Sequence, residues 1–356
     1  MNEKNLLFTL SDPFNEKKID LGRTENAEEL FGQIVLNKMI GVAYDNIELH
    51  TLHGELRKAL TILRNDYLYK SNLFKQHLKY LSTILDEYDK DYSLLKGSFL
   101  STNIYECGQR ISNDFDILID SKDISSLQSL LISNGFTQGS ISSSNEIIPA
   151  TRREIIESRM NFGETIPFVK LLDNEAMTID INFSLDYKMA SENSLISDFL
   201  GQAEYASFED VHFKVLNPID FIIHLSCHLY KEATTYDWVA RRRDLMLYKF
   251  SDINVFIHKY ASREYFDKLI TRIKQWNLEK ECYYTFENSS IIYPHLKAID
   301  GFEQMINSIK PDSLEFMKQI IYPREKKLFE YDLTFTDWFF SNDRVSRLKE
   351  IPYNRG

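Results

Sequence analysis

Two short segments in the middle of the chain alternate acidic and apolar residues with a period of two. They are residues 114–119 (DFDILI) and residues 178–183 (TIDINF). Successive side chains of a β-strand point to opposite faces of the sheet, so this alternation predicts two strands that each have one polar and one apolar face. If the strands are neighbours, Asp114, Asp116 and Asp180 meet on a single face.

Three clustered carboxylates repel one another unless cations neutralise them. Mg²⁺ favours oxygen ligands and commonly bridges carboxylates and substrate phosphates. Two such ions clamp the attacking and leaving oxygens of an in-line phosphoryl displacement. The pattern therefore indicates a site for Mg²⁺ or Mn²⁺, two ions in all. The alternative is that the acids belong to an ordinary solvent-facing strand, as Asp120 does at the end of the same segment.

The two segments belong to a stretch with mixed helical and strand signals. Before them, an apolar run leads into Lys96-Gly97-Ser98, which is typical of a turn. Residues 123–134 have helical spacing, and residues 167–172 and 176–185 read as strands joined by a short turn. We expect an α/β (α+β) core with a small mixed β-sheet, flanked by N-terminal and C-terminal helical regions. The expected regions are residues 1–90, 91–215 and 216–356.

Apolar residues at helical spacing predict the two flanks. On the N-terminal side we expect one helix over residues 26–44, with Asn26 in a capping box, and a second over 55–87 that breaks near 67–72. On the C-terminal side, Asn217 is an N-cap candidate followed by Pro218 at the first helical position. Further helices are expected over residues 240–260, 262–285, 300–320 and 338–348.

Composition limits the classes of protein that fit. The 356 residues include 42 Lys and Arg against 53 Asp and Glu, which gives a formal net charge of −11. A general nucleic-acid binder needs a basic face, so this balance argues against one. The three cysteines form no CxxC pair, and no segment reads as a signal peptide or a membrane helix. We expect a cytoplasmic protein that does not associate with a membrane.

The string LLKGSFLSTNIYECGQRISNDFDILID, followed by MTIDINFSL, resembles the DNA polymerase β-type nucleotidyltransferase superfamily. Within it, the chain is most similar to a bacterial group of uncharacterised nucleotidyltransferases. That group has a Lys-Gly pair, an arginine shortly before an Asp-x-Asp strand, and a later strand with a third carboxylate. Arg110 stands four residues before Asp114, as this pattern requires. Asn182 is a departure, because the group tends to have histidine there.

The resemblance implies a role for each matching residue. Gly97 and Ser98 would hold the β- and γ-phosphates of a nucleotide, and Lys96 and Arg110 would balance phosphate charge. Asp114 and Asp116 would bind both metal ions, while Asp180 would bind the catalytic ion and help to deprotonate the acceptor. For Arg110 a surface or ion-pairing role is the alternative.

The resemblance further implies an enzyme of the EC 2.7.7 type that uses a nucleoside triphosphate as substrate. The expected nucleotide is ATP. It would transfer the nucleoside monophosphate to a hydroxyl or phosphate and release pyrophosphate. The acceptor is open: a small molecule, peptide or protein fits the acidic chain better than a long nucleic acid. A toxin-like transferase acting on tRNA ends or protein, and a non-catalytic nucleotide-binding module, are the alternatives. Possible substrate contacts are Asn182, His224, His228 and Lys231, although the two histidines, four residues apart on one helix, could also bind zinc.

Overall fold

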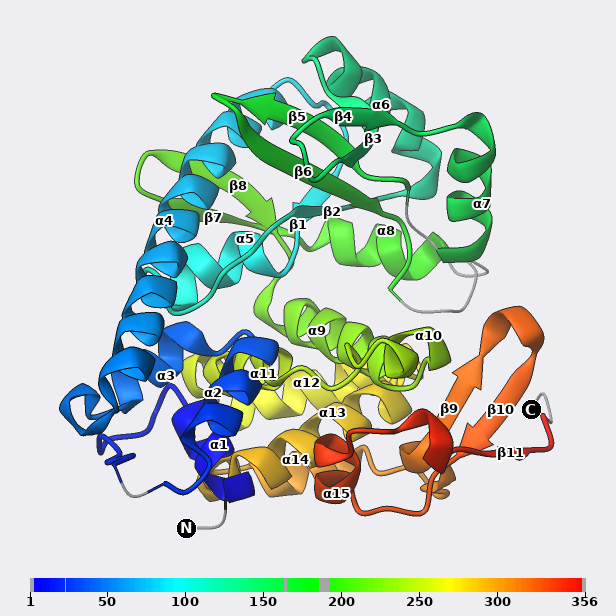
Figure 1. Cartoon of the computed structure of the whole chain (residues 1–356). Helices are drawn as coiled ribbons and strands as arrows, with labels where there is room; N and C mark the ends of the chain where they lie inside the picture. The colour runs from blue at the N-terminus through cyan, green and yellow to red at the C-terminus, as the bar shows by residue number, and fades with distance from the viewer. Residues whose placement is uncertain (1–2, 23, 163–164, 186–192, 354–356) are drawn as a thin grey trace. The chain divides into compact units, whose positions relative to one another are not determined.

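A computed structural model describes residues 3–22, 24–162, 165–185 and 193–353. The chain divides into two compact units (Figure 1). The first unit is discontinuous and combines Met1–Ile62 with Ile222–Gly356, and the second is Leu63–Phe221. The first unit thus combines residues 1–62 of the expected N-terminal region with residues 222–356 of the expected C-terminal region, whereas residues 63–90 belong to the second unit. No helix within the described part of the chain is both long enough and apolar enough to cross a membrane.

The second unit is built on an eight-stranded mixed sheet, as far as the chain is described. Its strand order is β4-β3-β5-β6-β2-β1-β8-β7. In chain order the strands are β1 Tyr92–Leu94, β2 Phe115–Ile119, β3 Thr137–Ile141, β4 Ile147–Pro149, β5 Phe168–Leu172, β6 Glu175–Asn182, β7 Glu204–Phe208 and β8 Val211–Val215. The strand pairs β2–β6 and β1–β8 are parallel, and the other neighbours are antiparallel. The mixed α/β class expected from the sequence is confirmed.

Helices of the second unit connect and cover these strands. They are α5 Gly97–Phe99 with the helical turn η2 Leu100–Ile104, η3 Ser121–Asp123, α6 Ile124–Ser133, α7 Arg152–Phe162 and α8 Asn193–Gly201. The long helix α4, Gly54–Leu85, supplies Phe74, whose ring stacks on Phe115 of β2 at a centroid distance of 4.3 Å. This contact buries the apolar face of β2 and leaves Asp116 on the other face.

The first unit is mostly helical (Figure 1). Its helices are α1 Glu3–Leu10, α2 Ala27–Leu36, α3 Ile40–Asn46, α9 Pro218–Ala233, α10 Tyr236–Ala240, α11 Leu247–Tyr260, α12 Arg263–Gln275, α13 Glu279–Ile292, α14 Phe302–Ser308 and α15 Phe335–Phe340. Short helical turns are η1 Leu49–Thr51, η4 Pro294–Ala298, η5 Glu315–Lys318, η6 Pro323–Glu325 and η7 Val345–Arg347. A three-stranded antiparallel sheet joins β9 Gln319–Tyr322, β10 Lys327–Glu330 and β11 Lys349–Ile351.

Several helix boundaries differ from the sequence prediction. The expected helix over residues 26–44 is two helices, because Lys38 has a φ of 57° and interrupts the turn between α2 and α3. The side chain of Asn26 makes no capping hydrogen bond. Helix α4 is continuous through residues 67–72, where a break was expected. The predicted helix over 262–285 is interrupted at Asn277, with a φ of 53°, between α12 and α13.

The start of α9 agrees with the prediction from Asn217 and Pro218. The Oδ1 atom of Asn217 accepts hydrogen bonds from the backbone N–H groups of Ile219 at 3.0 Å and Asp220 at 3.1 Å. These bonds satisfy two donors that a helix start otherwise leaves unpaired.

Candidate functional site

The two acidic strands lie side by side in the sheet. Strands β2 and β6 are parallel neighbours, and their register places Asp116 opposite Asp180. Side chains of register partners in a parallel pair point to the same face. Asp114, two residues before Asp116, follows the same alternation at the start of β2. The Asp116 side chain is buried, that of Asp180 is half-buried and that of Asp114 is exposed.

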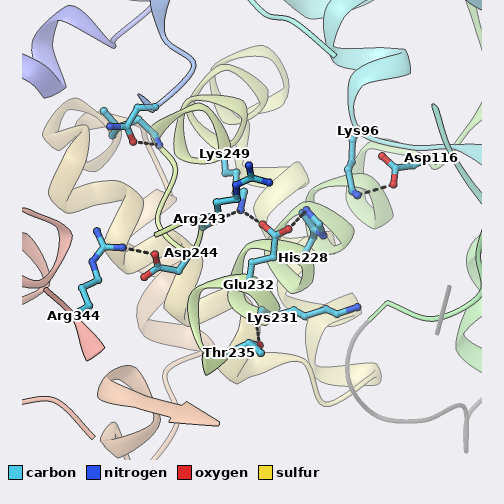
Figure 2. A network of polar contacts seen from close by, with 12 residues as sticks. Lys96, Asp116, His228, Lys231, Glu232, Thr235, Arg243, Asp244, Lys249 and Arg344 are labelled. Carbon is cyan, nitrogen blue, oxygen red and sulfur yellow. Dashed lines mark hydrogen bonds and ion pairs between the residues drawn. The ribbon is translucent and has the colours of Figure 1, made fainter. Parts of the chain in front are cut away.

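Lys96 holds a positive charge against this acidic face. Its Nζ atom lies 2.8 Å from Oδ1 of Asp116, and only 20% of the lysine side chain is exposed (Figure 2). Burial by itself would lower the pKa of Lys96, but the pKa is raised because Asp116, and then Asp114 and Asp180, favour the ammonium form. All three predicted carboxylates therefore act on a single ammonium group. The Nδ2 atom of Asn182 also donates to Oδ1 of Asp116, at 3.2 Å.

The Lys96-Gly97-Ser98 segment forms a tight turn between β1 and α5. Lys96 has a φ of 42° and a ψ of −113°, a conformation that side-chain-bearing residues rarely adopt. A Cβ atom on Gly97 would lie 1.9 Å from Oγ of Ser112, so only glycine fits at this position. Ser98 is fully buried, and its hydroxyl has no hydrogen-bond partner among the described residues. A buried hydroxyl of this kind calls for an external partner.

Arg110 lies beside this turn, as the sequence pattern suggests. Its guanidinium group is buried and donates from Nη1 to Oγ of Ser112 at 2.5 Å and to Oγ of Ser101 at 3.4 Å. Ser101 and Ser112 are also within hydrogen-bond distance of each other, at 3.1 Å. These two serines were not singled out from the sequence, because isolated serines in a turn-rich stretch carry no periodic signal. They fix the guanidinium next to Gly97.

The turn and the two acidic strands offer groups of the kind that bind a nucleotide and divalent metal ions. The turn fits a phosphate group, because it offers an unpartnered buried hydroxyl, an ammonium and a guanidinium. Asp114, Asp116 and Asp180 are oxygen donors of the kind that Mg²⁺ and Mn²⁺ prefer. Within the described ranges, however, no group of three or more His, Cys, Asp or Glu residues is arranged to hold a metal ion. The three carboxylates therefore fit a divalent metal ion in the type of their donor atoms and in the strand register that places Asp116 opposite Asp180.

The remaining predicted contacts lie on helix α9, in the first unit. His228 Nε2 is 3.5 Å from Oε1 of Glu232, and Glu232 forms an ion pair with the buried Lys249 (Figure 2). The rings of His224 and His228 lie 6.3 Å apart. Among the described residues these histidines belong to no metal-holding group, which gives the zinc interpretation no support. For His224, His228 and Lys231, contact with substrate stays a prediction.

An acidic strand pair beside a Lys-Gly-Ser turn is the arrangement expected of a nucleotidyltransferase. The sequence model of the family described as uncharacterised nucleotidyltransferase matches residues 23–294. The chain belongs to this family.

Other comparisons are more distant. One solved structure that the chain resembles is that of an antigenic nucleotidyltransferase-like protein from Paracoccidioides brasiliensis, with 14% identity and a TM-score of 0.34. The match covers 56% of this chain and 87% of the fungal one. No curated protein matches the sequence.

Proposed function

We propose that the protein is a metal-dependent nucleotidyltransferase that acts in the cytoplasm. It transfers a nucleoside monophosphate to a hydroxyl or phosphate group and releases pyrophosphate. The expected donor is ATP, from which AMP is transferred. Family membership supports nucleotidyl transfer in general. The single observation that supports catalysis by this chain is the register of Asp116 against Asp180 beside the Lys96 ammonium.

In the proposed reaction an oxygen of the acceptor attacks the α-phosphorus of the nucleotide. The bond from this phosphorus to the bridging oxygen breaks, and the electron pair leaves with pyrophosphate. When the acceptor is a hydroxyl, its proton passes to the carboxylate of Asp180. Divalent ions, held by Asp114, Asp116 and Asp180, would supply charge neutralisation at the attacking and leaving oxygens.

The turn residues bind and orient the triphosphate in this proposal. Ser98 donates its otherwise unpartnered hydroxyl to a phosphate oxygen, and the absence of a side chain at Gly97 lets Ser112 and the Arg110 guanidinium lie close to the backbone of the turn. The Arg110 guanidinium, held by two serines, faces the same turn and offsets phosphate charge. Because phosphoryl transfer requires little covalent participation by the protein, positioning and electrostatics account for most of the rate.

The net charge of −11 bears on the acceptor. A long polynucleotide would be repelled by most of this surface, so we propose a small molecule, a peptide or a protein side chain as acceptor. Asn182 in the second unit, and His224, His228 and Lys231 in the first, remain the residues that we propose as substrate contacts.

The test is incubation of the purified protein with cell extract, Mg²⁺ or Mn²⁺, and each nucleoside triphosphate labelled at the α-phosphate. We expect ATP to label one class of acceptor, and the Asp180→Asn variant to label none. Label on tRNA would instead identify RNA ends as the acceptor. Binding of ATP with no label on any acceptor would instead support a nucleotide-binding module.

A further inference from the structure

Lys96 occupies a backbone position that favours glycine, yet it carries a long cationic side chain. Its φ of 42° lies in the left-handed region, where a side chain adds strain. Backbone hydrogen bonds hold the turn in this shape, from Leu95 N–H to Asp116 O at 2.9 Å and from Leu100 N–H to Lys96 O at 3.0 Å. The fold thus accepts a strained residue at this point and directs its ammonium onto Asp116.

The ammonium binds an oxygen that a metal ion would need. Oδ1 of Asp116 accepts from both Lys96 at 2.8 Å and Asn182 at 3.2 Å. The charges of Asp114 and Asp180 act on the same ammonium. A divalent ion bound by these carboxylates would stand close to a fixed positive charge, and two like charges at short range in a half-buried site repel each other.

We propose that Lys96 is a resident counter-cation of the three carboxylates and competes with divalent metal for Asp116 until a triphosphate draws the ammonium away. The inference rests on the proposed function. It makes metal loading depend on nucleotide: the free protein binds metal weakly, and a phosphate oxygen that takes over Lys96 releases the carboxylate. Lys96 then acts as a positioning residue, first for Asp116 and then for the triphosphate.

The test measures Mn²⁺ binding to the free protein by electron paramagnetic resonance, without nucleotide. Lys96→Gln removes the charge but keeps a chain of similar length, and Lys96→Arg keeps the charge. We expect Lys96→Gln to bind Mn²⁺ about tenfold more tightly than the wild type, an effect within the usual range for coupling between sites. Lys96→Arg should stay near the wild type. The matched control is Lys79→Gln, which removes a lysine from an exposed ion pair with Asp210 in the same unit and should change nothing.

Thermal unfolding gives a second readout that does not depend on activity. In EDTA, Lys96→Gln should melt below the wild type because Asp116 loses its counter-charge, and Mn²⁺ should restore more of its melting temperature than it adds to the wild type. Should Lys96→Gln fail to fold in EDTA, we expect refolding with Mn²⁺, and refolding that is equally poor with and without metal would contradict the inference.

The outcomes separate the two proposals. If the wild type binds Mn²⁺ together with a non-hydrolysable ATP analogue, but Lys96→Gln alone binds Mn²⁺ no more tightly than the wild type alone, the counter-cation role is wrong and the proposed function stands. If no form of the protein binds Mn²⁺ with or without the analogue, the metal-dependent function fails and the inference fails with it.

Discussion

Each unit of the molecule contains a shielded acid–base pair, and the two pairs differ in their surroundings. In the first unit, Asp244 is fully buried against Arg344, whose guanidinium also donates to the backbone carbonyls of Trp338 and Phe339. Burial raises the pKa of Asp244, although Arg344 acts in the opposite direction. In the second unit Asp116 is also buried, whereas 20% of the Lys96 side chain remains exposed.

The second pair also has neighbours that the first lacks. Two further carboxylates act on Lys96, and the buried hydroxyl of Ser98 has no partner among the described residues. The Arg344 guanidinium, bound by a carboxylate and two backbone carbonyls, stabilises the fold. The Lys96 ammonium interacts with three carboxylates and is better suited to exchange one of them for a ligand. The comparison separates a structural ion pair from one suited to chemistry.

The largest effect is expected from the acidic strands. Asp116→Asn and Asp180→Asn should each lower the rate of label transfer by about a thousandfold or more, because each removes a metal ligand and a charge that the proposed reaction needs. The measurement is transfer from α-labelled ATP. Asp120→Asn is the matched control, since Asp120 directly follows β2, is buried and not solvent-facing as the sequence suggests, and is bonded to Ser197 and Lys122. Near-normal transfer by Asp116→Asn would contradict the assignment.

The next effect concerns the structural pair. Arg344→Met leaves Asp244 buried without its counter-charge, so we expect the free energy of unfolding to fall by about 3–5 kcal/mol. Chemical denaturation measures this loss. The exposed pair of Arg263 and Asp300 offers the control, because Arg263→Met should cost about 1 kcal/mol or less. Equal losses in the two variants would remove the distinction between buried and exposed pairs.

Gly97→Ala tests the Lys96-Gly97-Ser98 turn, which we propose binds the triphosphate. Its Cβ would overlap Oγ of Ser112 at 1.9 Å and Cβ of Ser112 at 2.6 Å, so we expect a loss of about 1–3 kcal/mol in unfolding free energy and weaker ATP binding. The double variant Gly97→Ala with Ser112→Gly removes both overlapping atoms and should recover part of the stability. If the second change brings no recovery in thermal unfolding, the crowding is not between these two residues.

The smallest effect is a pH dependence carried by His77 on α4. Burial lowers the pKa of His77, and Glu175 offsets only part of this. Below pH of about 6.5 the unfolded chain takes up a proton that the folded protein resists, so stability falls as the pH falls. We expect His77→Gln to reduce this loss by about 1 kcal/mol or less between pH 7.5 and 5.5. Substitution of the exposed His50 provides the control variant.

The acidic strands could be found in the sequence because their signal is local. The alternation at Asp114, Asp116 and Asp180 has a period that backbone geometry dictates, and Lys96-Gly97-Ser98 is contiguous. The prediction that the three acids share one face required β2 and β6 to be neighbours, and the structure shows them paired in parallel. The roles of these residues remain proposals.

Features without a local pattern were missed. Ser101 and Ser112 lie eleven residues apart in the sequence, and in the fold they contact each other as well as the guanidinium of Arg110. The β9–β10 hairpin turns at Lys326, which has a φ of 53° where glycine or asparagine would have marked the turn. Helix α4 runs through polar residues where a break was expected, because Tyr67, Ser71 and Phe74 are all buried on one side.

We propose above all that the acidic strands catalyse transfer of a nucleoside monophosphate. The most direct measurement follows ATP labelled at either the α- or the γ-phosphate, with Mg²⁺ and an acceptor-containing extract. We expect α-label on the acceptor, γ-label in pyrophosphate, and neither product with Asp180→Asn. Label from the γ-phosphate on the acceptor, or α-label transfer that persists in Asp180→Asn, would contradict it.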